Sequence, residues 1–490
     1  MNLCLIGQDF KYELEKLIRI FFPFEKIEFI YEENITSSCA VTCIFEKDGT
    51  FFAKAELYLF GKTYSKTETL TDGADEKERE LRLAQCLYHC LKEATSYEPE
   101  WGILTGVRPA KLFSRLCKEM GEQPAESYFE KEFYVNRKKI ALCKEARSGE
   151  ERIISLSKPE SFSLYISVPF CPTRCSYCSF VAHSVENAKG LIPQYVELLC
   201  REVEHTAKLA NRLNLRLETI YMGGGTPTIL SAEQLEKVIK TVKSSFDLRY
   251  LREFTVEAGR PDTITEERLL AIKNGGATRI SINPQTMENA VLEAIGRRHT
   301  AEQTVTAFNL ARKLGFENIN MDLIAGLPTD TFDGFCETLD KVLELSPESV
   351  TVHALSMKRS STLTKEGSFP EIEMGKAASQ MVDFAHDTLL KNGILPYYMY
   401  RQSKTVGNLE NVGYAKKGYE CLYNVYIMDE THTILACGAS AVTKLKQPGG
   451  TFIERIFNYK YPYEYIDRFG ELILRKNGVI AFYDKFGNRN

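Results

Sequence analysis

The sequence has little excess of charge of either sign and no long apolar run. Lys and Arg together number 62, Asp and Glu number 66, and the formal net charge is -4 at pH 7. Because there is no strong basic excess, we do not expect a nucleic-acid partner bound mainly through its phosphates. No run of 18 apolar residues occurs, so we expect no membrane span. The first nine residues lack the basic flank and apolar core of a signal peptide, which predicts a cytoplasmic protein.

The sequence also lacks internal repeats and low-complexity tracts, and its composition is that of an ordinary globular protein. Of its 490 residues, 44% are hydrophobic and 26% are charged, which is enough to bury a sizeable core. Its 14 cysteines, without an export signal, indicate a reducing compartment where thiols are free or bound to metal. An oxygen-sensitive metal cluster is compatible with that compartment.

Hydrophobic periodicity predicts four parts along the chain. In order, they are an N-terminal α+β domain, a helical segment with a linker, a (β/α)6 barrel and a C-terminal α+β extension on the substrate side, at residues 1–98, 99–160, 161–360 and 361–490. In the first part we expect strands at 3–6, 26–31, 39–45 and 51–60, and helices at 9–22 and 75–95. After a helix at 372–392, the last part is predicted to contain strands at 396–400, 423–428 and 433–436 and a helix near 463–474.

The third part alternates strands with helices in a regular way. Strands are expected at 163–167, 219–222, 253–257, 279–283, 318–323 and 350–355. Six strand–helix units in series imply parallel strands joined by right-handed crossovers. The fold class is therefore α/β, with an open or partial (β/α)6 barrel whose chemistry lies at the carboxyl ends of the strands.

Three cysteines follow the first of these strands at close spacing. Cys171, Cys175 and Cys178 form a Cys-x3-Cys-x2-Cys motif. Three thiolates on one loop can hold three irons of a 4Fe–4S cube and leave the fourth iron open. The alternatives are a loop of free thiols or a zinc site that lacks one ligand.

Polar residues and glycines also follow the later strands. Gly223, Gly224 and Gly225, before Thr226, would let the backbone approach a ligand closely, although a glycine run is more often just a tight turn. Glu257 ends the third strand, where a partly desolvated carboxylate needs a partner such as a ribose diol or an ammonium group. An exposed acid at a loop edge is the alternative for Glu257. Candidate polar residues near the ends of the fourth and fifth strands are Gln285 and Asp322.

These segments together resemble the radical S-adenosylmethionine (SAM) enzymes, and residues 163 to about 445 resemble the oxygen-independent coproporphyrinogen III oxidase family. Residues 101–112 and 398–414 resemble its coproporphyrinogen dehydrogenase branch, called HemZ. The resemblance implies that SAM chelates the fourth iron of the cluster. It also implies a SAM site, with the cysteines as cluster ligands. The SAM contacts implied are Tyr165, Gly223, Gly224, Gly225, Thr226, Glu257, Gln285, Arg297, Asp322 and Ala354.

The same resemblance implies an activity in haem biosynthesis: two propionates of coproporphyrinogen III are oxidatively decarboxylated to vinyl groups, giving protoporphyrinogen IX. An electron donor such as flavodoxin or ferredoxin is then expected. Phe180 stands where the best-understood members carry a fourth cysteine, and haem-chaperone relatives also have phenylalanine there. A haem-binding chaperone, or another radical SAM enzyme such as a methyltransferase, is the alternative.

Arginine suits the recognition of propionates because its guanidinium pairs with a carboxylate through two hydrogen bonds. We expect Arg401, in an aromatic-rich segment, to contact a propionate; a surface salt bridge is the alternative. No residue is assigned to a catalytic step. The pairs Cys86 with Cys90 and Cys39 with Cys43 are expected to be buried structural thiols.

Overall fold

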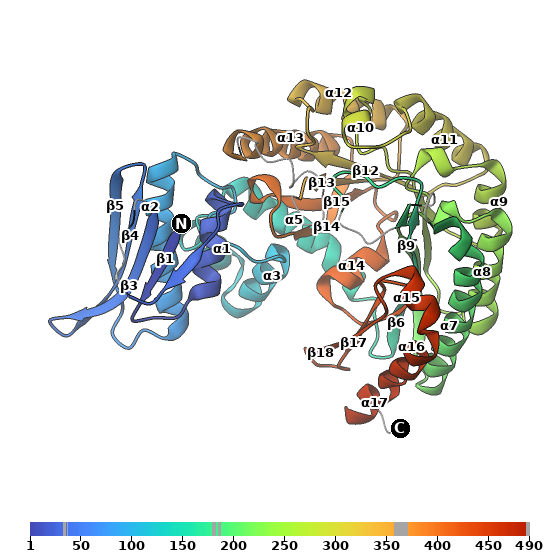
Figure 1. Ribbon diagram of the computed structural model, residues 1–490, viewed down its shortest axis with the longest axis horizontal. Coiled ribbons are helices and arrows are strands. Elements are labelled where there is room, and N and C mark those ends of the chain that lie inside the picture. Colours follow the sequence, from blue (N-terminus) through green and yellow to red (C-terminus); the bar gives the residue numbers. More distant parts are fainter. Residues whose placement is uncertain (33–35, 37, 179–182, 185–187, 357–370, 487–490) are drawn as a thin grey trace. The chain divides into compact units, whose positions relative to one another are not determined.

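The computed structural model describes two compact units (Figure 1). The described residues are all of 1–490 except 33–35, 37, 179–182, 185–187, 357–370 and 487–490. Unit 1 comprises Met1–Glu145, Gly367–Gln380 and Met399–Glu410. Unit 2 comprises Ala146–Glu366, Met381–Tyr398 and Asn411–Asn490. The division into four parts stays a prediction.

Unit 1 contains a five-stranded sheet packed against helices. Its strand order is β2-β1-β3-β4-β5, with β1 parallel to both neighbours and β3, β4 and β5 antiparallel. The strands are β1 (Asn2–Ile6), β2 (Glu28–Ile30), β3 (Cys39–Lys47), β4 (Thr50–Leu59) and β5 (Lys62–Thr69). The helices α1 (Lys11–Phe21) and α2 (Glu76–Thr95) share one apolar core with the sheet.

Two tight hairpins fix the register of this sheet. Asp48 and Gly49, between β3 and β4, have φ of 51° and 79°, and Phe60 and Gly61, between β4 and β5, have φ of 54° and 73°. Two consecutive residues with positive φ are typical of the type I′ turns that match the twist of the strands. The predicted strands and helices of this region are confirmed, and the sequence analysis missed β5.

A buried ion pair lies in the rest of unit 1. Lys139 donates to Glu410 Oε1 (2.8 Å), and Trp101 Nε1 donates to Glu410 Oε2 (2.7 Å). Burial alone would raise the pKa of Glu410, but the charge of Lys139 and these two hydrogen bonds hold it below its usual value. Breaking such a pair from one side leaves an uncompensated buried charge, which costs about 3–5 kcal/mol. Neighbouring helices are α3 (Pro109–Met120), α4 (Glu122–Lys131) and the first part of α5 (Arg137–Ile154).

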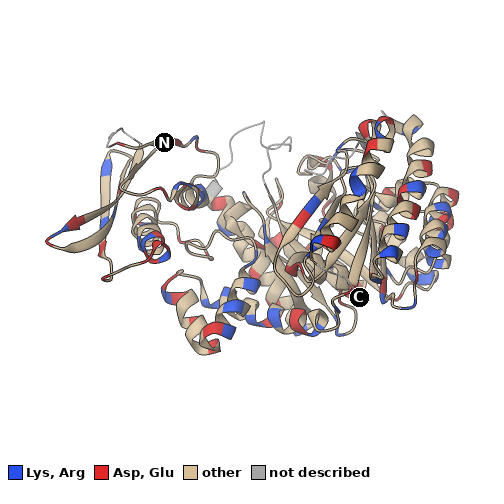
Figure 2. Ribbon diagram, turned by 90° about the horizontal axis from the view of Figure 1, so that it is seen from below, with Lys and Arg blue, Asp and Glu red and all other residues tan. Residues whose placement is uncertain are grey.

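Unit 2 is built on six parallel strands in consecutive order, as predicted. The strands are β6 (Ser161–Val168), β9 (Arg216–Gly224), β10 (Glu253–Glu257), β11 (Arg279–Ser281), β12 (Ile319–Ala325) and β13 (Ser349–Ala354). Helices on their outer side are α7 (Ile192–Arg212), α8 (Ala232–Ser245), α9 (Glu266–Asn274), α10 (Asn289–Ala294), α11 (Ala301–Lys313) and α12 (Phe332–Glu344). Capping boxes at Ser231 with Gln234 and at Thr300 with Gln303 begin two of these helices. Basic and acidic residues are interspersed along them (Figure 2).

The C-terminal extension lengthens this sheet at both edges. β15 (Glu410–Ala415) pairs antiparallel with β13, and β14 (Leu395–Arg401) lies next to it. On the other side, β16 (Thr433–Cys437) pairs parallel with β6, followed by β17 (Val442–Lys446) and β18 (Ile453–Phe457). The remaining helices are α13 (Glu371–Lys391), α14 (Leu422–Asp429), α15 (Pro462–Asp467), α16 (Phe469–Lys476) and α17 (Gly478–Lys485). No helix in the described part of the chain is long and apolar enough to cross a membrane.

The predicted strand at 423–428 is wrong, because these residues form α14. Glu253, which is 5% exposed, accepts hydrogen bonds from the backbone N–H of Leu422 (2.7 Å) and of Tyr423 (3.3 Å). A carboxylate at a helix N-terminus satisfies N–H groups that have no partner within the helix. This distant acid favours a helix where the local pattern of apolar and aromatic residues indicated a strand.

A second buried carboxylate holds the C-terminal elements to α7. Glu202, on α7, is fully buried and accepts hydrogen bonds from the backbone N–H of Gly438 (2.7 Å), from Asn458 Nδ2 (2.8 Å) and from the Tyr465 hydroxyl (2.6 Å). Lys476 Nζ lies 2.9 Å from the same carboxylate. Four partners for one buried acid leave few alternatives for how these segments pack.

Candidate functional site

The three cysteines lie on the loop after β6, at the carboxyl end of the barrel strands. None of the three is in a disulfide bond; Cys175 is 8% exposed, and Cys171 and Cys178 are half-buried. The backbone N–H of Cys178 donates to the carbonyl of Cys175 (3.2 Å), and that of Ser176 donates to the carbonyl of Ile295 (3.0 Å). The second bond anchors the loop to the region after α10.

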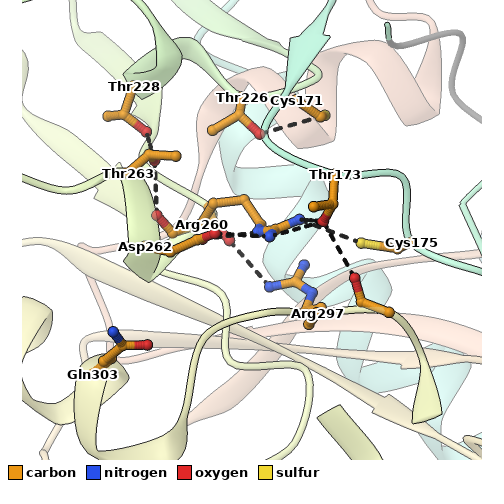
Figure 3. Close-up of polar contacts among 12 residues, drawn as sticks. Cys171, Thr173, Cys175, Thr226, Thr228, Arg260, Asp262, Thr263, Arg297 and Gln303 are labelled. Atoms are coloured by element: carbon orange, nitrogen blue, oxygen red, sulfur yellow. Dashed lines mark hydrogen bonds and ion pairs between the residues drawn. The ribbon is translucent and has the colours of Figure 1, made fainter. Parts of the chain in front are cut away.

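Hydrogen-bond donors from other loops point at two of these sulfurs (Figure 3). The Thr226 hydroxyl donates to Cys171 Sγ (3.5 Å), and Arg260 Nη1 donates to Cys175 Sγ (3.6 Å). Such donors stabilise thiolates, and thiolates are what an iron–sulfur cluster requires. The donor set therefore fits a 4Fe–4S cluster held by three cysteines.

Without metal, the cysteine loop favours the thiol form at Cys171. Burial raises the pKa of Cys171 to about 11, and the hydrogen bond from Thr226 only partly opposes this rise. Cluster assembly must therefore displace a proton there. Within the described residues, no three His, Cys, Asp or Glu side chains are grouped around a single ion. A cube does not need such a group, because each thiolate binds a different iron.

The glycine run at the end of β9 is required by close contacts within the protein. A Cβ at Gly223 would lie 2.9 Å from Cδ of Glu257, and one at Gly225 would lie 2.6 Å from the carbonyl oxygen of Phe170. Gly224 has φ of 109°, a conformation that residues with a side chain rarely adopt. The turn therefore lies directly against both the cysteine loop and Glu257. Its role in binding SAM stays a prediction.

Glu257 lies beside this turn and is held by a tyrosine. The Tyr221 hydroxyl donates to Glu257 Oε1 (2.6 Å). Burial raises the pKa of Glu257 to about 7; the carboxylate of Asp322 adds to the rise, while hydrogen bonds from Tyr221 and the backbone of Gly224 limit it. This acid can change its charge near neutral pH.

Three tyrosines from different elements stack beside Glu257. The ring of Tyr221 lies 4.5 Å from that of Tyr423 on α14, and Tyr165 on β6 lies 6.3 Å from Tyr221 and 6.1 Å from Tyr423, measured between centroids. Stacked rings of this kind present flat apolar faces. Of the three, the sequence identified only Tyr165, because the other two carry no motif signal.

Gln285, beyond the end of β11, lies against β12, the strand that carries Asp322. The backbone N–H of Gln285 donates to the carbonyl of Asp322 (2.9 Å), and Gln285 has a positive φ of 70° while only 6% exposed. A buried residue held in this conformation marks a constrained turn. Burial alone would raise the pKa of Asp322, but His353 and the amide of Asn320 (2.6 Å) lower it. Asp322 therefore stays ionised.

Arg297 is buried beneath the cysteine loop. It donates through Nη2 to the Tyr177 hydroxyl (3.1 Å) and through Nη1 to the carbonyl of Asn283 (2.7 Å). It is 8% exposed. Its predicted contact with the carboxylate or ribose of SAM stays a prediction, as does the place of Ala354 beside the adenine. Ala354 ends β13 and donates its backbone N–H to Asn411 Oδ1 (3.1 Å).

Arg401 belongs to unit 1, whereas the other predicted site residues belong to unit 2. It is 3% exposed, donates through Nη1 to the carbonyl of Leu104 (2.7 Å), and its guanidinium carbon lies 5.2 Å from the ring centroid of Trp101. Burial lowers the pKa of Arg401 to about 10. The surface salt bridge considered as an alternative is wrong. The propionate contact stays a prediction, and the burial of the guanidinium argues against it.

Phe180, which bears on the choice between oxidase and chaperone, lies outside the described residues. Comparison with known proteins also bears on that choice. Residues 165–342 match the family model described as the radical SAM superfamily. The chain is 38% identical over 404 residues to the "oxygen-independent coproporphyrinogen-III oxidase-like protein HemZ" of Bacillus subtilis, covering 82% of this chain and 81% of that protein.

Two further relatives bear on the function and the fold. The "heme chaperone HemW" of Haemophilus influenzae is 29% identical over 66% of this chain and 80% of its own length. The solved structure of HemN, the coproporphyrinogen III oxidase of Escherichia coli, aligns with a TM-score of 0.51 at 22% identity, over 65% of this chain and 71% of that chain. This likeness confirms the fold. The chain belongs to the oxygen-independent coproporphyrinogen-III oxidase-like family of the radical SAM superfamily, whose cofactors are a 4Fe–4S cluster and SAM.

Proposed function

We propose that this protein is an oxygen-independent coproporphyrinogen III dehydrogenase. It would convert two propionate side chains to vinyl groups and so form protoporphyrinogen IX. Each conversion would release carbon dioxide, pass one hydrogen atom to the 5′-deoxyadenosyl group of SAM, and leave one electron for an external acceptor. The observation that carries the proposal is the extent of the likeness to HemZ. The aligned region covers 82% of this chain. Unit 2 makes up a smaller share of the chain than that, so the aligned region includes much of unit 1.

The residues at the barrel mouth have distinct roles in this proposal. Cys171, Cys175 and Cys178 would hold three irons, and the bound cluster with SAM supplies one-electron, hydrogen-abstracting chemistry. Glu257, oriented by Tyr221, would accept hydrogen bonds from ribose hydroxyls or an ammonium group. Each of these residues binds or orients, and none is assigned a proton-transfer step.

Two features of the surroundings support a radical reaction. The stack of Tyr165, Tyr221 and Tyr423 places apolar ring faces next to Glu257, which limits water at this position. The Asp322 carboxylate, kept ionised by His353 and Asn320, would face the adenosine. The electron would come from a small donor protein such as a flavodoxin or a ferredoxin.

The test is turnover under anaerobic conditions. The reconstituted protein, given SAM, coproporphyrinogen III and a chemical reductant, should release 5′-deoxyadenosine together with protoporphyrinogen. Cys175→Ser is the matched inactive control. Formation of 5′-deoxyadenosine without any porphyrin product would refute this substrate and leave the radical SAM assignment intact.

A haem-binding chaperone is the second candidate, since several relatives carry that name. These matches cover 66% and 58% of the chain, so neither aligned region is much longer than unit 2 alone. Tight binding of one haem per chain, measured by titration of the Soret band, with no conversion of coproporphyrinogen, would favour the chaperone.

A further inference from the structure

Arg260 lies in the loop after β10, three residues beyond Glu257, and is 4% exposed. Its guanidinium makes a two-pronged contact with Asp262, through Nε to Oδ1 (3.0 Å) and through Nη2 to Oδ2 (2.9 Å). On its other side, Nη1 and Nη2 each donate to the hydroxyl oxygen of Thr173 (3.2 Å), and Nη1 also donates to Cys175 Sγ (3.6 Å). Figure 3 shows Arg260 between Asp262 and these two residues of the cysteine loop.

The position of this guanidinium is fixed by its own loop. The carbonyl of Arg260 accepts hydrogen bonds from the backbone N–H (2.9 Å) and the hydroxyl (2.8 Å) of Thr263. The Thr263 hydroxyl in turn lies 2.6 Å from that of Thr228, in the loop after β9. Arg260 is thus a rigid cation whose donor is aimed at a sulfur, and not a flexible surface side chain.

We propose that Arg260 is a positioning residue that raises the reduction potential of the cluster through its hydrogen bond to the Cys175 sulfur. The inference rests on the proposed assignment of Cys175 as a cluster ligand. One-electron reduction by an external donor adds one negative charge at the irons and sulfurs. A cationic N–H donor at a ligand sulfur stabilises that added charge, and the nearby carboxylate of Asp262 opposes it.

The alternative is that Arg260 only fastens the cysteine loop to the barrel through Thr173. If the role is purely mechanical, a variant should bind less cluster, and its midpoint potential should not shift in a direction set by the charge that was removed. An electrostatic role predicts opposite shifts when the cation and its counter-charge are removed separately. The two roles can therefore be separated by measuring potentials.

The experiment is an anaerobic redox titration of the reconstituted holoprotein, with dithionite and mediators, followed by electron paramagnetic resonance. In Arg260→Met, the ratio of reduced to oxidised cluster at the wild-type midpoint should fall about tenfold, a shift of ~59 mV to lower potential. In Asp262→Asn the midpoint should rise. Arg312→Met is the control, because Arg312 donates to the carbonyl of Phe316 and to the carboxylate of Glu348, outside this loop. Its midpoint should stay that of the wild type.

Two outcomes would overturn the proposal. One is an unchanged midpoint in Arg260→Met with full iron content, and the other is a midpoint shift of the same sign in Arg260→Met and Asp262→Asn. If Arg260→Met does not retain iron, Asp262→Asn decides: a rise supports the proposal, and no rise overturns it. Retention of the cluster by Cys175→Ser would overturn the ligand assignment and the inference together. If the midpoint potential falls in Arg260→Met and rises in Asp262→Asn, but the protein does not convert coproporphyrinogen, the inference holds and only the proposed substrate is refuted.

Discussion

Glu257 should make the binding of SAM depend on pH near neutrality. Burial raises the pKa of Glu257 to about 7, and a carboxylate that accepts hydrogen bonds from SAM must be ionised. With that pKa, roughly one-tenth of the sites are ionised at pH 6 and roughly nine-tenths at pH 8. We therefore expect the affinity for SAM to be about tenfold lower at pH 6 than at pH 8, a difference of ~1.4 kcal/mol.

The assay is equilibrium binding of labelled SAM to the anaerobically reconstituted protein between pH 6 and pH 8. Glu257→Gln is measured beside the wild type, because it keeps the shape of the side chain and removes its titration. The amino group of SAM titrates in both proteins, so the difference between the two profiles reports Glu257 alone. The same pH profile in both proteins would refute the reasoning.

The same shift has a consequence for stability, with a definite sign. The pKa of Glu257 is raised from 4.5 to about 7, so the folded protein binds this proton more tightly than the unfolded chain does. The contribution of Glu257 to stability is therefore fully present below pH 4.5 and is lost as the pH rises through about 7, a difference of roughly 3 kcal/mol. Without SAM, Glu257→Gln should be more stable than the wild type at pH 8 and nearly equal at pH 4.5 in urea unfolding. A less stable variant at pH 8 would contradict the assigned burial cost.

Three further predictions use different observables. Cys175→Ser should lose the visible absorbance of the cluster, whereas Cys336→Ser, a half-buried thiol on α12, should keep it. Gly223→Ala places a methyl group 2.9 Å from Cδ of Glu257. The affinity for SAM should therefore fall at least about tenfold, with unchanged iron content. An unchanged affinity would argue against this turn as a SAM site. Lys139→Met should lower the free energy of unfolding by about 3–5 kcal/mol, and adding Glu410→Gln should recover most of it; equal loss in both variants would mean that the buried charge is not the cause.

Sequence reasoning found the barrel because its six strands alternate regularly with helices. It also gave Glu257 and Asp322 as candidates, because the carboxyl ends of parallel strands meet at one edge of a sheet, and their contact with SAM stays a prediction. The local pattern failed at α14, where the deciding partner is Glu253, far away in the sequence. No pattern within residues 422–429 contains that information.

The site residues that were missed share one physical property: their partners lie on other elements. In the sequence, Tyr221 and Tyr423 resemble ordinary core aromatics. Only the fold shows that their rings stack beside Glu257. Arg260 reads as a loop arginine until the fold brings it to Cys175. Spacing along the chain reveals candidate residues that share one loop, such as the three cysteines. It does not reveal a cation supplied by the next loop but one.

The burial of Arg401 changes what the likeness to HemZ means. Residues 101–112 and 398–414 are the stretches that resemble that branch, and residues 101–112 and 399–410 both lie in unit 1. Trp101 donates to Glu410, and Arg401 donates to the carbonyl of Leu104 and packs over Trp101. These contacts form one buried polar centre, in which Arg401 Nε has no hydrogen-bond partner among the described residues. Where the likeness to HemZ reaches unit 1, it therefore includes residues that stabilise the fold, and the anaerobic turnover assay tests the proposed activity directly.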